Sequence, residues 1–302
     1  MLVVHDLLVA RGVLGALGVV APRPSLGPDR VELARRSFAR ACVGVRRWCY
    51  GPRVATAGIV IIGDEILTGK FADENAAFLI GELRALGVDL RRIVVIPDVL
   101  EDIAATVTEF AARFDLVFTS GGVGPTHDDV TMAGIARGFG TTVMREPVLE
   151  ERVRAYWGAK LAPPHLRLAE VPAGAELVYG KDQVWPVVAY RNVYILPGVP
   201  ALFRRKFIDI RDRFRAEPMT VARAYLDADE GQIAGDLDAV VAAFPAVRIG
   251  SYPRFSERDF KVLITFEGLA ASDVAGALAM LAERIGPRIV RQEPPAPAGG
   301  TG

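Results

Sequence analysis

The segment from Thr119 to Thr131, TSGGVGPTHDDVT, constrains the fold most. It follows Asp115–Phe118, which reads as a short buried strand, and it precedes helix-compatible apolar spacing from Val130 to Phe139. The glycines therefore fall where a strand of a parallel sheet leads into a helix. Glycine has no Cβ and tolerates positive φ, so backbone N–H groups at such a turn can face an anion at close range.

From Ala55 onward, strand and helix patterns alternate. Ala57–Ile62 is a continuous apolar run, typical of a strand covered on both faces, whereas Asn75–Leu86 has its apolar residues on one helix face. Further strands are predicted at Val88–Ile96 and Asp115–Thr119, further helices at Glu101–Phe114, Pro147–Lys160 and Ala201–Phe214, and a hairpin turn at Arg191-Asn192. This alternation predicts a three-layer α/β/α fold with a mostly parallel sheet and ligands at the carboxyl ends of its strands.

The last third of the chain has a different order of elements. Strands are predicted at Thr220–Leu226, Val247–Tyr252, Phe260–Phe266 and Arg288–Val290, and helices at Glu230–Phe244 and Ser272–Ile285. This β-α-β-β-α-β order predicts a smaller ferredoxin-like or KH-like α+β domain. We therefore expect a main domain over residues 54–216, a small domain over 217–292, and a disordered tail over 293–302, which is rich in Pro, Ala and Gly.

Residues 1–53 are expected to form an extension outside the fold. The apolar stretch Leu7–Val20 has Asp6 before it instead of a cluster of positive charge, which is unlike a signal peptide. The arginines between Arg35 and Arg47 fit a mitochondrial presequence, but nearby acidic residues do not. A start codon assigned too far upstream is the other reading, and the alternatives stay open.

Charge and cysteine content exclude several classes of protein. Lys+Arg and Asp+Glu number 36 each, so no overall field favours nucleic acid or an acidic membrane, and no apolar run is long enough to span a bilayer. Cys42 and Cys49 are the only cysteines, which argues against a disulfide scaffold or a cysteine zinc site. A cytoplasmic protein with a small-molecule ligand is expected.

Two acidic pairs follow predicted strands. Asp64-Glu65 follows Ala57–Ile62, and Asp128-Asp129 follows the glycine turn. Because parallel strands end at the same edge of a sheet, these carboxylates can meet on one hard divalent cation such as Mg²⁺, Mn²⁺ or Co²⁺ and orient water, with Asp64, Asp128 and Asp129 as catalytic candidates. Taken alone, either pair is equally well a solvated turn with a helix cap.

Polar groups around the turn are candidate ligands for phosphate. Gly121, Gly122 and Gly124 can cradle it, although a tight turn for packing alone would need the same glycines. The remaining substrate-binding candidates are Ser120, Thr126, Asn75, Gly198 and Pro200. For Asn75, capping of its helix is the favoured interpretation over ligand binding, and a single histidine such as His127 is more often exposed to solvent than catalytic.

Several motifs together resemble a known family. Gly58–Lys70 (GIVIIGDEILTGK) and Ser120–Thr131 resemble the molybdopterin-binding (MoaB/Mog) domain, in the branch that includes the N-terminal domain of CinA. NVYILPGVP at 192–200, ADEGQI at 228–233 and IGSYP at 249–253 look still more like the molybdopterin-binding domain of eukaryotic FAD synthase and its stand-alone bacterial relatives. The resemblance covers roughly Ala55–Val290.

The resemblance implies an enzyme and a homo-oligomer. In this branch it implies divalent-metal-dependent hydrolysis of FAD to FMN and AMP, or of ADP-ribose to AMP and ribose phosphate. Molybdenum-cofactor proteins have Gly-Gly-Thr-Gly where this chain has Val123 in place of the threonine. A pterin-binding protein of molybdenum-cofactor biosynthesis and a non-catalytic nucleotide-binding module are the alternatives.

Overall fold

The computed structural model describes residues 54–181, 185–254 and 259–298. The predicted extension over residues 1–53 lies outside these ranges. The described chain contains a six-stranded sheet, a four-stranded sheet and a short two-stranded ribbon. None of its described helices is both long and apolar enough to cross a bilayer.

The six-stranded sheet is mostly parallel. Its order is β2-β1-β3-β8-β7-β6. Strand β1 pairs in parallel with β2 and β3, and β3 pairs in parallel with β8, whereas β7 is antiparallel to β8 and to β6. The strands span Thr56–Ile62 (β1), Asp89–Ile96 (β2), Leu116–Ser120 (β3), Glu176–Val178 (β6), Val187–Tyr190 (β7) and Val193–Leu196 (β8).

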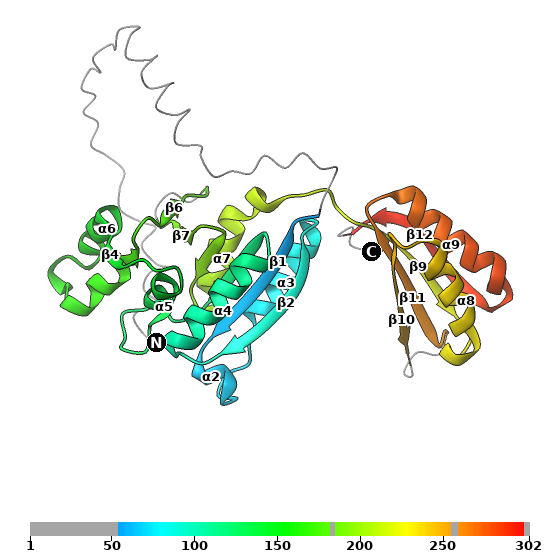
Figure 1. The fold of residues 1–302 in the computed structure, drawn as a ribbon, viewed down its shortest axis with the longest axis horizontal. Helices are drawn as coiled ribbons and strands as arrows, with labels where there is room; N and C mark the ends of the chain where they lie inside the picture. Colours follow the sequence, from blue (N-terminus) through cyan, green and yellow to red (C-terminus); the bar gives the residue numbers. More distant parts are fainter. Residues whose placement is uncertain (1–53, 182–184, 255–258, 299–302) are drawn as a thin grey trace, which may run out of the picture. The chain divides into compact units, whose positions relative to one another are not determined.

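Helices cover both faces of this sheet (Figure 1). In β1, Ile59 and Ile61 belong to one apolar cluster with α3 (Asn75–Ala85) and α7 (Pro200–Ile210). The alternate residues Val60 and Ile62 belong to a second cluster, to which α4 (Leu100–Arg113), α5 (Thr131–Gly138) and α6 (Pro147–Trp157) contribute. Side chains of a strand point alternately to its two faces, so a doubly covered strand must be apolar throughout. The predicted three-layer fold is confirmed.

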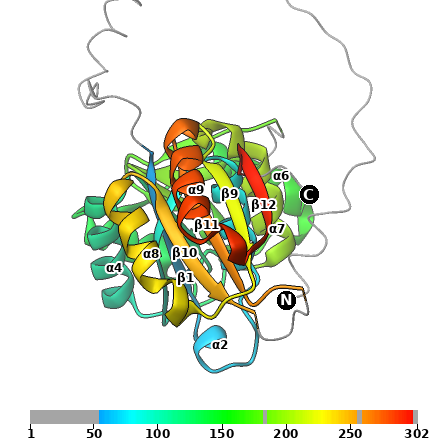
Figure 2. The same ribbon diagram turned by 90° about the vertical axis from the view of Figure 1, so that its right-hand side faces the viewer.

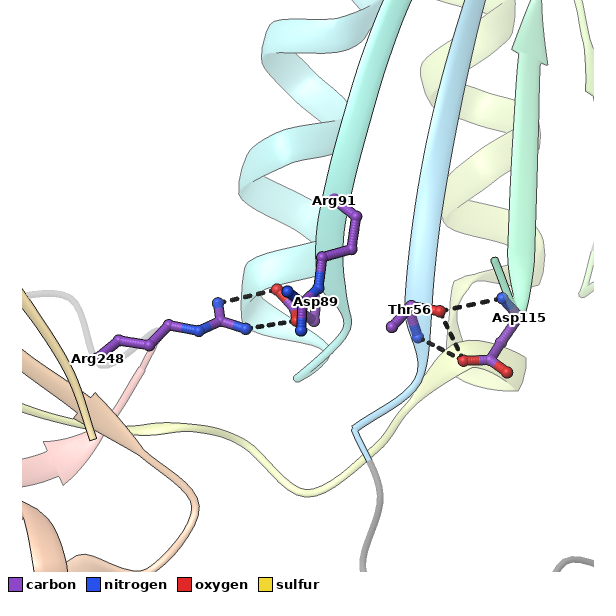
Figure 3. A network of polar contacts seen from close by, with 5 residues as sticks. All are labelled: Thr56, Asp89, Arg91, Asp115 and Arg248. Atoms are coloured by element: carbon purple, nitrogen blue, oxygen red, sulfur yellow. Dashed lines mark hydrogen bonds and ion pairs between the residues drawn. The ribbon is translucent and has the colours of Figure 1, made fainter. Parts of the chain in front are cut away.

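Hydrogen bonds fix the edge of the sheet opposite the glycine turn. The Thr56 N–H and Oγ1 donate to Asp115 Oδ2 at 2.8 and 2.7 Å, and the Asp115 N–H donates back to Thr56 Oγ1 at 3.2 Å (Figure 3). Asn192, in the predicted hairpin turn, donates through Nδ2 to the carbonyls of Ala111 and Phe114 at 3.0 and 2.8 Å. These bonds hold the entries of β1, β3 and β8 together and so set the register of the strand ends opposite them.

Short elements fill out the main domain. Helix α2 (Asp64–Leu67) directly follows β1, and β4 (Val143–Arg145) pairs with β5 (Glu170–Pro172). Three short 3-10 helices also lie here, namely η3 (Gly158–Lys160), η4 (Pro163–Ala169) and η5 (Arg211–Phe214). The predicted helices Pro147–Lys160 and Ala201–Phe214 thus each end in a 3-10 turn, whereas η4 was not predicted.

The small domain has the predicted β-α-β-β-α-β order. It consists of β9 (Thr220–Leu226), α8 (Glu230–Ala243), β10 (Arg248–Pro253), β11 (Val262–Gly268), α9 (Ala271–Ile285), η6 (Gly286–Arg288) and β12 (Ile289–Pro297). Its antiparallel sheet has the order β10-β11-β9-β12, and Figure 2 shows α8 and α9 on one face of it. Alternate residues of β9, such as Ala222, Ala224 and Leu226, face these helices in an apolar core.

The predicted disordered tail is wrong for the part that the structure describes. Strand β12 pairs with β9 as far as Pro297, and its register shifts between Glu293 and Ala296. Because β12 is an edge strand, prolines are tolerated there although they cannot donate to the ladder. Tyr225 Oη and Arg223 Nη1 both donate to the carboxylate of Glu293, at 2.6 Å each. Only residues 299–302 of the predicted tail lie outside the described chain.

Asp89, the first residue of β2, is buried between two arginines (Figure 3). It accepts hydrogen bonds from both terminal nitrogens of Arg248, at 2.9 Å from Nη1, and its Oδ2 lies 2.6 Å from Arg91 Nε. This bidentate contact raises the pKa of Arg248, because the hydrogen-bonded carboxylate stabilises the guanidinium cation. The pair is one polar contact between β2 and β10.

Candidate functional site

The glycine loop, residues 121–130, joins β3 to α5 in a conformation that needs glycine. Gly121 has φ 107° and Gly122 has φ 62°. A Cβ on Gly121 would overlap the carbonyl oxygen of Ile62 at the end of β1, and a Cβ on Gly122 would overlap Thr131 Oγ1. Thr131 closes the loop, since its N–H donates to Gly122 O at 3.0 Å and its hydroxyl to Gly121 O at 2.9 Å. These glycines are thus required by close packing as well as by backbone conformation.

Asp129 folds back onto the loop. Its Oδ1 accepts from the Gly124 N–H at 2.6 Å, and its Oδ2 accepts from the Thr126 N–H at 2.8 Å and from the Thr126 hydroxyl. Three of the roughly four acceptor positions of a carboxylate are therefore occupied. Asp129 therefore shapes the loop. Binding of metal by Asp129 stays a prediction.

The N–H groups of Gly121, Gly124, Thr126 and Asp129 in the loop already donate within the protein. The Gly121 N–H donates to Leu196 O at 3.2 Å and the Gly124 N–H donates to Asp129. These two predicted cradle residues therefore shape the loop, and an anion would meet other N–H groups of the loop first.

His127 does not line the site, because its side chain is 96% exposed and its nearest ionic neighbour is Asp128 at 3.9 Å.

Arg167 is a loop contact that the sequence did not indicate. From η4, its Nη1 donates to Thr126 O at 2.8 Å and lies 3.5 Å from Pro125 O. Forty-one residues separate Arg167 from Thr126, and η4 is a short irregular helix, so no local pattern predicts the contact. The loop is held from inside by Asp129 and from outside by Arg167.

A buried polar group connects the glycine loop to the second predicted loop. Asn75 Nδ2 donates to Ser120 Oγ at 2.9 Å and to Gly198 O at 2.7 Å. Gly198 lies against Gly121, since a Cβ built on it would be 3.2 Å from Gly121 Cα, and Pro200 begins α7 just beyond. Asn75 is 4% exposed and its Oδ1 has no hydrogen-bond partner among the described residues. The structure therefore brings together three predicted substrate-binding residues, Asn75, Ser120 and Gly198, and their binding of substrate stays a prediction.

The acidic residues after β1 and β2 lie together. Asp64 and Glu65 form the first turn of α2, not an open turn, and the Asp64 N–H donates to Asp98 Oδ2 at 3.0 Å. Asp98 follows β2 and also approaches the glycine loop, since a Cβ on Gly122 would be 3.3 Å from its Oδ1. Sequence reasoning missed Asp98. The signal was present, because Asp98 follows a predicted parallel strand just as Asp64 does.

Electrostatics define an acidic cluster of Asp64, Glu65, Asp98 and Asp128. Partial burial raises the pKa of Asp98, the hydrogen bond from the Asp64 N–H lowers it in part, and the negative charges of Glu65, Asp64 and Asp128 raise it further. The pKa of Asp128 is held below its usual range, first by the neighbouring Thr126 hydroxyl. Asp64, Glu65 and Asp128 of the two predicted pairs therefore act on a common residue, Asp98, whereas Asp129 is turned into the glycine loop.

The cluster suits a hard cation by its chemistry. It consists of carboxylates, which Mg²⁺ and similar ions prefer, and a cation would offset the mutual repulsion that acts on Asp98. However, among the residues that the structure describes, no three His, Cys, Asp or Glu side chains converge tightly enough to form a preformed metal site. Binding of a cation by these carboxylates therefore stays a prediction.

Asp98→Asn is expected to stabilise the fold at neutral pH. The amide keeps the acceptor for the Asp64 N–H but removes one of the repelling charges, a gain of about 0.5 kcal/mol for a partly exposed group. Because the folded pKa of Asp98 is raised, the penalty appears as pH rises above about 4 and is absent below it. Thermal denaturation in EDTA at pH 7 and pH 4 measures this. A lower melting temperature at pH 7, or a gain of equal size at both pH values, would contradict it.

A cavity of about 210 Å³ opens beside the glycine loop. Its walls are the loop itself and apolar side chains, with one basic residue, Arg167, and two acidic residues, Asp129 and Glu170. The lining residues are Gly122, Val123, Gly124, Asp129, Val130, Met132, Ala133, Val143, Arg167, Leu168 and Glu170. Gly122 faces both this cavity and Asp98, so the loop separates the cavity from the acidic cluster.

Comparisons with known proteins identify two matched regions. Residues 58–214 match the family described as "Probable molybdopterin binding domain", and residues 218–293 match "FAD synthase, middle domain". These regions correspond to the six-stranded and four-stranded sheets with their helices.

Individual relatives agree with these matches. A "Probable FAD synthase" of Caenorhabditis elegans is 31% identical over 79% of this chain and 51% of its own length, so the chain spans about half of that relative. A protein of Archaeoglobus fulgidus is 35% identical over 67% of this chain and 90% of its own length. The crystal structure of CinA from Thermoplasma acidophilum, 29% identical, covers 53% of this chain and 99% of that one with a TM-score of 0.49. The chain belongs to the molybdopterin-binding domain family, in a form related to FAD synthase.

Proposed function

We propose that this protein is a divalent-metal-dependent pyrophosphohydrolase that cleaves FAD, or a related ADP-containing dinucleotide, to AMP and a second monophosphate. Two matches support FAD as the substrate: the region that matches the middle domain of FAD synthase, and the relative named "Probable FAD synthase". Hydrolysis is the part of the proposal that rests on the site.

The single observation that carries hydrolysis is the acidic cluster beside the glycine loop. The negative charges of Asp64, Glu65 and Asp128, which follow β1 and β3, all act on Asp98, which follows β2. Such repulsion opposes folding, and carboxylates gathered at the carboxyl ends of parallel strands are typical of functional sites. Proteins retain arrangements of this kind where a cation and a polyanionic substrate neutralise them.

Each part of the site has a separate task in this proposal. Asp64, Glu65, Asp98 and Asp128 would hold the cation, which when bound supplies positive charge to the pyrophosphate oxygens. Free N–H groups of the glycine loop would bind the pyrophosphate, while Asp129 keeps the loop in shape. The unpartnered Asn75 Oδ1 would accept a hydrogen bond from a substrate hydroxyl. Water adds to one phosphorus, the bridging oxygen leaves with the other, and the water proton ends on a product phosphate.

Incubation with candidate substrates tests the proposal. Purified protein with FAD, ADP-ribose or NADH, in Mg²⁺, Mn²⁺ or Co²⁺, is expected to release AMP from FAD in at least one metal and none in EDTA. Absence of AMP from every substrate in every metal would contradict the proposal. Tight nucleotide binding without turnover would instead favour a non-catalytic nucleotide-binding module.

The family match favours one second candidate, a molybdopterin-binding protein of molybdenum-cofactor biosynthesis. It would use the same loop for the phosphate of a pterin. Retention of molybdopterin by the purified protein, without hydrolysis of any dinucleotide, would establish it. The homo-oligomer implied by the resemblance stays a prediction.

A further inference from the structure

We infer that the cavity beside the glycine loop, defined above by its lining residues, binds the planar heteroaromatic ring of one half of the dinucleotide. The inference rests on the proposed function, because it assigns one part of that substrate to one part of the site. It adds a subsite distinct from the acidic cluster.

The chemistry of the walls fits a flat aromatic ring. Val130, Met132, Val143 and Leu168 supply apolar surface, and a methionine thioether makes favourable contacts with aromatic rings. Arg167 adds a donor group at the cavity wall, and Glu170 and Asp129 add acceptor groups. A ring with apolar faces and polar edges matches such a lining, whereas a bare phosphate or a sugar would leave the apolar walls unused.

The size of the cavity limits it to part of the substrate. Sites that enclose a whole drug-sized ligand measure about 300–1,000 Å³. At about 210 Å³ this cavity accommodates one ring system, and the remainder of a dinucleotide must lie outside it.

The glycine loop provides the route from the ring to the phosphates. Gly122 lines the cavity and also lies next to Asp98, so a ligand whose ring fills the cavity would pass its phosphates along the loop toward the acidic cluster. Arg167 lines the cavity while it holds the Thr126 carbonyl. Guanidinium groups stack on aromatic rings, so a ring in the cavity would also steady the outer contact of the loop.

Val143→Asp tests the subsite with Val148→Asp as its matched control. Val143 lines the cavity and is 38% exposed, whereas Val148 in α6 is 40% exposed and does not line it. Neither substitution buries a carboxylate fully, so both variants are expected to fold. Ala133→Phe, which fills the cavity from α5 without adding charge, is the second test variant.

The probes are FMN, AMP and inorganic pyrophosphate, each titrated into the protein in Mg²⁺ and followed by calorimetry. Val143→Asp and Ala133→Phe are expected to weaken binding of either FMN or AMP at least tenfold, and to leave pyrophosphate within twofold of wild type. The monophosphate affected identifies which ring occupies the cavity. Val148→Asp is expected to bind all three like wild type.

Other outcomes overturn the inference. Unchanged affinity for both monophosphates, absence of FMN and AMP binding to the wild type, or an equal loss of pyrophosphate binding would each contradict a ring subsite. Failure of the proposed function would give a different experimental result from failure of the ring subsite. In that case FAD stays intact in every metal, while the cavity variants still weaken FMN or AMP selectively.

Discussion

Gly121→Ala is expected to destabilise the protein by about 3 kcal/mol or more and to abolish hydrolysis. At φ 107° the backbone is in a region that alanine avoids, and the added Cβ would overlap the carbonyl oxygen of Ile62. Backbone atoms of β1 cannot move aside without disturbing the pairing of β1 with β3. Chemical denaturation monitored by circular dichroism measures the loss.

Gly140→Ala is the matched control for backbone strain alone. Gly140 has φ 67°, also positive, but a Cβ there meets no atom within 4 Å. We expect a loss of only about 1–2 kcal/mol, and hydrolysis at the wild-type rate. Equal destabilisation by the two substitutions would show that the close contact of Gly121 with Ile62 contributes nothing.

Asp129→Asn is expected to reduce hydrolysis at least 100-fold while leaving the fold intact. The carboxylate accepts three hydrogen bonds within the loop, and an amide has one oxygen and one donating nitrogen in their place. At least one of the Gly124 and Thr126 donors would then face another donor. The loop would lose the shape that presents its remaining N–H groups, at a cost of about 1–3 kcal/mol in stability. Steady-state kinetics with FAD measures the rate.

Thr126→Val separates loop shape from charge. It removes the hydroxyl that donates to Asp129 but keeps every carboxylate of the site. A smaller loss of activity in the same direction is expected if Asp129 acts through the loop. A near wild-type rate in Asp129→Asn would contradict any requirement for this residue.

The sequence predicted the architecture well where the physics is local. Thr220–Leu226 is mostly apolar and buried, and its predicted bounds match β9. Ala57–Ile62 is apolar throughout because helices cover both of its faces, and only its first residue was missed. Periodicity of this kind survives in a single sequence because burial of a strand or helix face acts at every second to fourth residue.

Two site residues and one strand were not predicted from the sequence, either because their contacts are long-range or because composition was misleading. Arg167 donates a hydrogen bond to the glycine loop, which is distant in the sequence. Asp98 belongs to the acidic cluster because the carboxylates of α2 and of the glycine loop lie near it. The tail was misread because its prolines indicated disorder, whereas an edge strand accommodates Pro294 and Pro295 at a register shift. For Arg167 and the tail, the deciding neighbours are distant in sequence and leave no local pattern, whereas the position of Asp98 after a predicted strand was a usable signal.

The most direct measurement of the central claim is the initial rate of AMP release from FAD as a function of Mg²⁺ concentration, for wild type and Asp98→Asn. We expect the initial rate of the wild type to rise with Mg²⁺ concentration and then saturate. For Asp98→Asn we expect either a rate at least 100-fold lower or a much higher Mg²⁺ requirement. Asp238→Asn in α8 serves as the control and is expected to behave like wild type. Identical Mg²⁺ curves for wild type and Asp98→Asn would contradict a cation site built around the acidic cluster.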